Sequence, residues 1–234
     1  MCTGFVKKGK DLICGFNMDL PDGVWNYRVY TRKDQFFVGV GPAFAPIRIH
    51  GVGSGGRFGN LPYMNAPERG RFRLGFGRRR IDSLVHRYIG GKLDFDRLEH
   101  LARTKEIVNL PGHSMHSLFC DAEGRILLVE PGDGARRIEE NEAVISNFPL
   151  MVPPEDLTPE RHGFYGVDRY DRAMSMLRTA GDDFSMADGM EVLRAVAQRQ
   201  YAPTRVSFVY SRRENAVLYA LEGQFDKLHR WEFA

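Results

Sequence analysis

Residues 1–20 of the chain read MCTGFVKKGKDLICGFNMDL, and they contain the residues from which the rest of the fold is predicted. The apolar segments 2–7 and 11–16, separated by a Lys-Gly-Lys turn, predict a pair of short strands. Cys2 directly follows the initiator methionine, although the 234 residues include only three cysteines. Most cysteines are small buried residues, so the position of Cys2 is its unusual feature.

That position indicates a nucleophile. Removal of Met1 would leave Cys2 with a free α-amine beside its thiol. An α-amine titrates at about pH 7.7–8.0, so part of it is neutral at cellular pH and can accept a proton. One residue would then carry both the nucleophile and its base, as in N-terminal nucleophile enzymes.

The composition predicts a globular chain with a substantial core, because 43% of the residues are hydrophobic and 12% are aromatic. We expect a single domain over residues 1–234, with Met1 removed. No apolar run approaches the roughly 18 residues of a membrane span, and no secretory signal is present, so we expect no membrane partner. Three cysteines do not form a disulfide framework and indicate a cytoplasmic location. A net charge of +3 is too small to indicate a nucleic-acid partner.

Predicted helix pairs alternate with groups of predicted strands. Apolar residues at helical spacing predict helices over 81–91, 94–107, 168–181 and 185–198, the last with Ser185 as its N-cap. Runs of aromatic and β-branched residues predict strands before, between and after these pairs. This order predicts an α+β domain in which helices cover layered antiparallel sheets.

Three other motifs have structural explanations that we prefer. GVGSGG at 51–56 matches a dinucleotide-binding pattern, but no helix follows it, which favours a glycine-rich turn. RGRFRLGFGRRR at 69–80 could bind RNA or an anionic partner, but the nearly balanced whole-chain charge favours a solvated loop. His113 and His116 lack the paired spacing of a zinc site, and His50 stands alone. We therefore expect no metal ion and no cofactor.

The N-terminal stretch resembles the opening of the choloylglycine hydrolase family, which includes penicillin V acylases and bile-salt hydrolases. In that family Met-Cys-Thr is followed by Gly-Arg-Asn-Met-Asp, and here MCT is followed by GFNMD at 15–19. The aspartate is present as Asp19, whereas Phe16 stands in the place of the arginine. The resemblance implies a compact N-terminal nucleophile hydrolase with a four-layer αββα sandwich of two antiparallel sheets flanked by helix pairs.

The similarity continues downstream in the order of the family. GRFGNLPYMN is similar to the segment that supplies part of the oxyanion hole, and Tyr63 stands where penicillin V acylases tend to carry tyrosine. SNFP resembles the Thr/Ser-Asn-x-Pro motif, which places the oxyanion asparagine at Asn147. TRVSFVY resembles the strand Thr-Arg-Tyr-Ser-x-Val, which places the active-site arginine at Arg205.

The resemblance implies a role for each of these residues. Cys2 would attack an amide carbonyl, with its own α-amine as the base. Asp19 would hold that α-amine by a charge-assisted hydrogen bond. The Asn147 side chain and the Tyr63 backbone N–H would stabilise the oxyanion. Arg205 would lower the pKa of the thiol. Phe16 removes a second cation, which implies a less acidic thiol or a site rebuilt for a more apolar acyl group.

The implied function is hydrolysis of a linear amide in an N-acylated small molecule. We expect no partner other than this substrate and further copies of the chain in a homo-oligomer. The first alternative is an acyltransferase of the same architecture that passes the acyl group to an amine. The second is a relative with impaired catalysis that binds a ligand. Taken singly, Asn147 and Asp19 could belong to turns, Arg205 to a surface ion pair and Tyr63 to the core. The identity of the acyl amide is left open.

Overall fold

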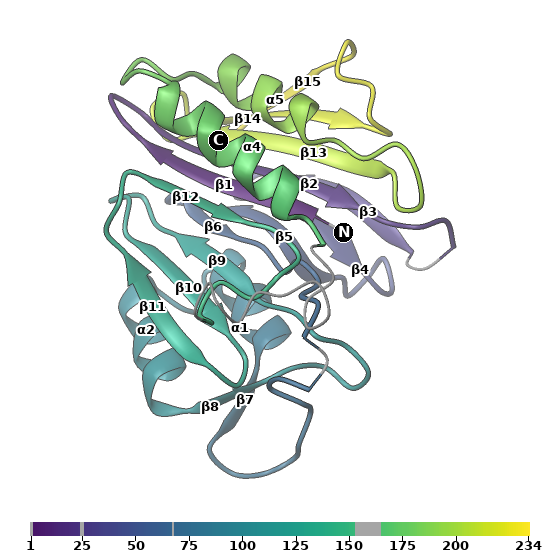
Figure 1. The fold of residues 1–234 in the computed structure, drawn as a ribbon, viewed down its shortest axis with the longest axis vertical. Helices are drawn as coiled ribbons and strands as arrows, with labels where there is room; N and C mark the ends of the chain where they lie inside the picture. The colour runs from purple at the N-terminus through teal and green to yellow at the C-terminus, as the bar shows by residue number, and fades with distance from the viewer. Residues whose placement is uncertain (1, 24–25, 67, 153–164) are drawn as a thin grey trace.

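Two antiparallel sheets lie face to face in the computed structural model, with a pair of helices on each outer side (Figure 1). The structure describes residues 2–23, 26–66, 68–152 and 165–234, so Met1 lies outside the described residues. The expected four-layer αββα architecture is confirmed. No helix within these ranges is long and apolar enough to cross a membrane.

The first sheet contains the predicted N-terminal strand pair at its centre. Its six strands, in spatial order, are β12 (Glu142–Ile145), β1 (Cys2–Lys8), β2 (Leu12–Asp19), β13 (Thr204–Ser211), β14 (Ala216–Leu221) and β15 (His229–Glu232).

The second sheet is formed by the middle of the chain. Its seven strands, in spatial order, are β11 (Gly134–Ile138), β10 (Ile126–Glu130), β9 (Ser117–Cys120), β6 (Arg57–Gly59), β5 (Ile47–Gly53), β4 (Gln35–Val40) and β3 (Tyr27–Arg32). Residues 54–56 connect β5 and β6, so the glycine-rich motif is a hairpin turn as expected.

Within the described ranges, four helices cover the sheets: α1 (Ile81–Ile89) and α2 (Phe95–Thr104) on the second sheet, and α4 (Val167–Thr179) and α5 (Met186–Ala195) on the first. Ser185 caps α5 as predicted, in a capping box with Asp188. The helix predicted over 94–107 was too long. Its last residues instead form β8 (Glu106–Val108), which pairs in parallel with β7 (Arg78–Arg80).

The central core lies between the sheets. Cys2 and Phe16 project into it from the first sheet, and Phe36 and Phe58 project into it from the second. Gly4 lies opposite Phe16 across β1 and β2. A Cβ at Gly4 would lie only 2.8 Å from the Phe16 ring, so the missing side chain makes room for that ring. Large apolar side chains here remove much surface from water, which stabilises the stacked sheets.

Two outer cores attach the helices. Phe5 and Ile13 alternate with the central-core residues along β1 and β2 and pack against Leu177 of α4 and Met190 of α5. On the other side, the core between the second sheet and its helices includes Phe37, Phe119, Tyr88 and Leu98.

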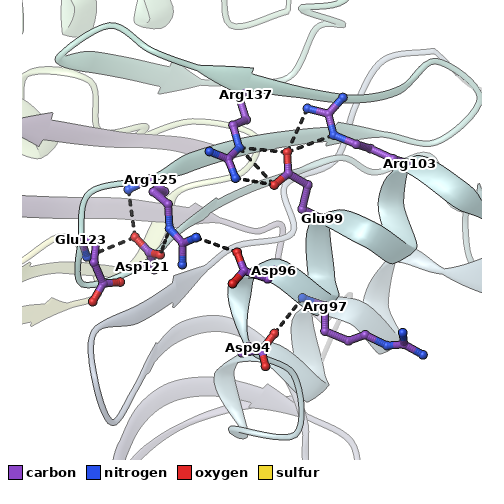
Figure 2. A network of polar contacts seen from close by, with 9 residues as sticks. All are labelled: Asp94, Asp96, Arg97, Glu99, Arg103, Asp121, Glu123, Arg125 and Arg137. Carbon is purple, nitrogen blue, oxygen red and sulfur yellow. Dashed lines mark hydrogen bonds and ion pairs between the residues drawn. The ribbon is translucent and has the colours of Figure 1, made fainter.

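A charged network joins α2 to the second sheet (Figure 2). Glu99 of α2 accepts hydrogen bonds from the Arg137 guanidinium of β11, at 2.9 Å from Nε and 2.5 Å from Nη2. Arg125, just before β10, donates to Asp121 and to Asp96 of α2, each at 2.6 Å. We call these five residues the α2 network.

The topology of the first sheet brings four strand ends together. Because neighbouring strands run antiparallel, β1 and β13 begin at the same end of the sheet at which β12 and β2 finish. Cys2 pairs with Met18, and Asp19 pairs with Thr204. The chain leaves β12 at Ile145, one residue before Ser146 and two before Asn147. Residues distant in the sequence therefore meet around Cys2.

Candidate active site

Cys2 lies at the first position of β1, and only 6% of its surface is exposed. Its backbone nitrogen donates a hydrogen bond to Asn147 Oδ1 at 2.8 Å. Asn147 Nδ2 in turn donates to the Tyr63 carbonyl oxygen at 2.6 Å. The Asn147 side chain therefore connects the nitrogen of the candidate nucleophile to the Tyr63 segment, rather than capping a turn.

Arg169, in the first turn of α4, binds several groups around Cys2 at once. Its Nη2 donates to Asn147 Oδ1 at 2.8 Å. Its Nη1 lies 3.0 Å from the Cys2 carbonyl oxygen, 2.9 Å from Thr3 Oγ1 and 3.3 Å from Asp19 Oδ2. The five residues Cys2, Thr3, Asp19, Asn147 and Arg169 are called the Cys2 cluster below.

Gly166 allows Arg169 to reach this position. It precedes α4 with a φ of 83°, in the left-handed region that favours glycine. A Cβ on Gly166 would lie 2.2 Å from Ser146 Oγ and 2.7 Å from Arg169 Nη2. Both the backbone conformation and the close approach therefore require glycine at this position.

The Asp19 carboxylate is buried at the end of β2. Thr204 Oγ1 donates to its Oδ1 at 2.6 Å, and Arg169 lies beside its Oδ2. Burial raises the Asp19 pKa from 3.8 to about 7, and the Thr204 hydrogen bond and the Arg169 charge only partly oppose that rise. We expected Asp19 to hold the Cys2 nitrogen. The described partner of that nitrogen is Asn147, while the backbone N–H of Asp19 bonds the Cys2 sulfur.

The thiol of Cys2 is not acidified. Burial raises its pKa above the ordinary value, because the thiolate would lose its water. The charge of Asp19 acts in the same direction, whereas the backbone N–H of Asp19 and the charge of Arg169 oppose it. The charge of the N-terminus also lowers the thiol pKa, but burial outweighs both cations, so a thiolate held by a neighbouring cation stays a prediction.

Arg205 does not occupy the predicted place beside Cys2. Its guanidinium donates to the Leu20 carbonyl at 3.2 Å, to Glu222 at 2.6 Å and to Asp22. The register of β13 against β2 shifts between Thr204 and Val206, and this bulge leaves Arg205 without a partner in β2. The cation beside Cys2 is Arg169 instead.

Tyr63 presents its backbone to Asn147. It forms an isolated antiparallel bridge with Met115, flanked by the bonds from Met64 N to Ser114 O and from His116 N to Pro62 O. In such a pair the N–H and C=O of the central residue both point away from its partner. The Tyr63 carbonyl accepts from Asn147, so its N–H points to the same side. That N–H has no hydrogen-bond partner within the described ranges, and the residue is 42% exposed rather than part of the core.

A cavity of about 290 Å³ opens beside the Cys2 cluster. Cys2, Asp19 and Tyr63 lie in its wall, which is otherwise mostly apolar and includes Met18, Leu20, Val40, Ile49, Leu61 and Met115. His50, Asp82 and His113 also line it. Where the structure describes the chain, no group of three or more His, Cys, Asp or Glu side chains could hold a metal ion.

A buried ion pair supports the segment that carries Asn147. His116 Nδ1 lies 3.0 Å from Glu130 Oε1, and His116 Nε2 lies 2.7 Å from the Ser146 carbonyl oxygen. Burial acts to raise the Glu130 pKa, but the hydrogen bond and charge of His116 outweigh it, so the pKa is lowered. His116 therefore holds the residue before Asn147 in place.

Solved structures share this architecture. A mutant of the conjugated bile acid hydrolase from Clostridium perfringens has a TM-score of 0.70 at 12% identity, over 99% of this chain and 92% of that chain. The chain has the N-terminal nucleophile hydrolase fold. Penicillin V acylase from Agrobacterium tumefaciens has a TM-score of 0.64 at 15% identity, over 94% of this chain and 83% of that chain. A Caenorhabditis elegans ortholog of N-acylethanolamine-hydrolyzing acid amidase has a TM-score of 0.55 at 17% identity, over 90% and 93%.

The resemblance noted in the sequence is thereby confirmed at the level of the fold. No protein-family profile matches the sequence, and no curated protein matches it in sequence.

Sequence reasoning missed Arg169, although the sequence holds a signal for it. Arg169, Ala173 and Leu177 are spaced by four residues and therefore share one face of α4. All three are buried. A basic residue on the apolar face of an amphipathic helix must find partners inside the protein, because burying an unpaired charge is costly.

Proposed function

We propose that the protein hydrolyses the linear amide bond of an N-acylated small molecule, with Cys2 as the nucleophile. One observation carries this proposal. Cys2 lies in the wall of an apolar cavity, where its nitrogen donates a hydrogen bond to Asn147, and Asp19 and Arg169 donate hydrogen bonds to it. An N-terminal cysteine fixed at the wall of a cavity has the parts that covalent amide cleavage needs.

Maturation of the protein removes Met1 and converts the Cys2 nitrogen into an α-amine. The catalytic reaction follows. The α-amine takes the thiol proton as the sulfur attacks the amide carbonyl. The raised thiol pKa makes this transfer necessary, because the sulfur is protonated at neutral pH. The C–N bond then breaks, the departing amine takes the proton from the α-ammonium, and a thioester remains on Cys2. Water attacks the thioester, releases the carboxylic acid and restores the thiol.

Two donors are available for the oxyanion of the tetrahedral intermediate. The Tyr63 N–H points to the same side as the Asn147 amide, and Asn147 Nδ2 has a second hydrogen besides the one bonded to the Tyr63 carbonyl. Losing one such donor typically costs about 3–4 kcal/mol of transition-state stabilisation. Arg169 acts as a positioning residue, since it binds the Cys2 carbonyl and Asn147 Oδ1 together.

The cavity favours an apolar acyl group. Its volume of about 290 Å³ corresponds to roughly ten groups of the size of water or methylene, at about 30 Å³ each. Phe16, which replaces the family arginine, is fully buried in the central core against His50 of the cavity wall and brings no charge to that place. Together these features support a medium-length acyl chain in preference to a highly charged one.

Three measurements test the proposal. Intact mass of the purified protein should lack Met1, because a retained methionine would block the proposed base. A small thiol reagent should label Cys2 faster than Cys14 and Cys120, which are completely buried. N-acyl p-nitroanilides should release nitroaniline with the wild type and not with Cys2→Ala. Retention of Met1, or equal release by both proteins, would contradict the proposal.

The two alternatives have different outcomes. An acyltransferase would form a new amide when a primary amine is added, and its release of free acid would fall correspondingly. A ligand-binding relative is favoured by the raised thiol pKa, which leaves the sulfur unreactive unless the α-amine assists. That alternative predicts tight binding of N-acyl amides without any product or thioester in the mass spectrum.

A further inference from the structure

His50 is a buried polar residue in the wall of the cavity that contains Cys2. It lies on β5, and only 2% of its surface is exposed. Its ring stacks on Phe16, with a distance of 4.2 Å between ring centroids and an angle of 31° between planes. The stacking and the strand backbone fix the orientation of the imidazole. Nothing in the reaction proposed above uses this residue.

The hydrogen bonds of His50 define where its proton lies. The backbone N–H of Leu61 donates to Nδ1 at 3.0 Å, so Nδ1 must carry a lone pair. Burial lowers the His50 pKa to about 3, so the ring is neutral at physiological pH. The single proton of a neutral imidazole is then on Nε2.

The Nε2–H donor has no hydrogen-bond partner within the part of the chain that the structure describes. Because Nδ1 faces the Leu61 backbone, Nε2 lies on the opposite side of the ring. The other polar groups of the wall are engaged. Tyr27 donates to Glu222, and the Asp82 carboxylate is paired with Arg80. An apolar ligand that displaced water from this donor would leave it unsatisfied, and an unsatisfied buried donor costs free energy.

We propose that His50 is a specificity-determining residue whose Nε2–H donates a hydrogen bond to an uncharged oxygen in the acyl chain of the substrate. This inference rests on the proposed amide hydrolysis. It narrows the substrate class to N-acyl amides whose acyl chain carries an ether, carbonyl or hydroxyl oxygen.

The experiment is an oxygen scan of the acyl chain. N-octanoyl p-nitroanilide is compared with analogues in which each methylene in turn is replaced by an ether oxygen. With the wild type, one oxygen position should have a kcat/KM about tenfold above its neighbours in the scan, because only there does the ligand satisfy the donor. A kcat/KM below that of the octanoyl substrate at every oxygen position, with no position above its neighbours, would overturn the inference.

Two variants assign the preference to His50. His50→Asn keeps an oxygen acceptor near the place of Nδ1 for the Leu61 N–H but removes the donor into the cavity. It should lose the peak of the scan, so that the ether analogue favoured by the wild type no longer has a higher kcat/KM than its neighbours. His50→Gln can place an amide N–H near the position of Nε2 and should restore part of the peak. A peak that persists in His50→Asn would assign the preference to another residue and overturn the inference.

A binding assay separates this inference from the proposed function. Cys2→Ala should bind the favoured ether analogue about tenfold more tightly than the octanoyl compound, measured by calorimetry with no turnover. If the wild type cleaves no amide but this difference is found, the hydrolase proposal fails and the His50 assignment stands. If amides are cleaved and neither kcat/KM nor binding shows a preferred position, the hydrolase proposal stands and the His50 assignment fails.

Discussion

The Cys2 cluster and the α2 network use the same chemical pair, arginine with carboxylate, in opposite surroundings. The Arg169 side chain is 4% exposed, and its partner Asp19 is completely buried. In the α2 network shown in Figure 2, the side chain of Arg137 is 37% exposed, and that of Asp96, which pairs with Arg125, is 77% exposed. Water and salt screen the second set but not the first.

The difference lies in what each arginine binds. Arg137 pairs with Glu99, whose side chain is 14% exposed, and the guanidinium itself reaches the solvent. Arg169 supplies hydrogen bonds to a carbonyl, a hydroxyl, an amide and a carboxylate that have lost their water. Exposed ion pairs contribute about 0–1 kcal/mol each, whereas breaking a buried set by removing one partner typically costs about 3–5 kcal/mol. Arginine–carboxylate contacts therefore differ in their consequences according to how deeply they are buried.

The largest expected effect is that of Arg169→Met. We expect the free energy of unfolding to fall by about 3–5 kcal/mol, because four buried acceptors lose their donor. Amide hydrolysis should fall at least about 100-fold, since Asn147 and Cys2 lose their common anchor. Urea unfolding and p-nitroanilide turnover measure the two effects. Arg137→Met is the surface control, with a change within about 1 kcal/mol. Similar losses in both variants would remove the distinction between the two regions.

Arg205→Met provides a second control for the same prediction. Its guanidinium pairs with Asp22 and Glu222 at the surface, so turnover should stay within about twofold of the wild type. A loss as large as that of Arg169→Met would restore the role first predicted for Arg205.

The next effect is a pH dependence that Asp19 imposes on stability. Its pKa is raised from 3.8 to about 7 in the folded protein, so the folded state holds more protons than the unfolded state between these values. Stability should therefore fall as pH rises from about 4 to 7 and level off above that range, by up to about 4 kcal/mol. The measurement is the difference in unfolding free energy between wild type and Asp19→Asn across this range. Parallel curves for the two proteins would show that Asp19 keeps its ordinary pKa.

A smaller effect is expected for Thr204→Val. The hydroxyl donates to Asp19 and accepts from the Gln198 N–H, and a hydrogen bond to a charged group is worth about 1.5–3 kcal/mol. The loss should be largest above pH 7, where Asp19 is ionised, and the Asp19 pKa should rise further. Thr204→Ser, which keeps both hydrogen bonds, is the matched control. A loss in Thr204→Ser as large as that in Thr204→Val would show that the hydroxyl is not the group that stabilises this position.

The smallest effect is expected in the α2 network. Glu99→Gln removes the charge that Arg137 and Arg103 share, and we expect a loss within about 1 kcal/mol that shrinks as salt is added. Urea unfolding at low and high salt measures it. A loss of several kcal/mol that is independent of salt would place this network in the same class as the Cys2 cluster.

Local patterns were sufficient to predict much of the site. Cys2 and Asp19 lie at the free ends of a predicted strand pair, so their proximity follows from the length of the hairpin. Asn147 and Tyr63 follow from motifs whose order matches the fold, and the structure brings both close to Cys2. These positions depend on the alternation of strand residues and on topology, which the sequence pattern carries.

Other features depend on contacts between distant segments. A single bulge after Thr204 leaves Arg205 without a strand-register partner in β2, and nothing in the sequence TRVSFVY predicts that bulge. Arg169 is buried only because α4 lies over the end of the first sheet, which requires Gly166 and Ser146 to meet. The sequence at 106–108 continues the helical pattern of the preceding residues, but these residues form a strand because they pair with β7. His50 belongs to no sequence motif, and its orientation is set by the contact with Phe16 and the hydrogen bond from Leu61.

The place of β1 inside the first sheet has a consequence for how the protein is made. β1 lies between β2 and β12, and β13 covers the other side of β2. At roughly 5–20 residues per second, the ribosome needs about 10–40 s after making β1 before it completes β13. During that interval β2 lacks its neighbour β13, and until β12 is made the first residue of β1 is accessible to a peptidase. If Met1 is removed as we propose, the removal can take place during synthesis, before the sheet closes around Cys2.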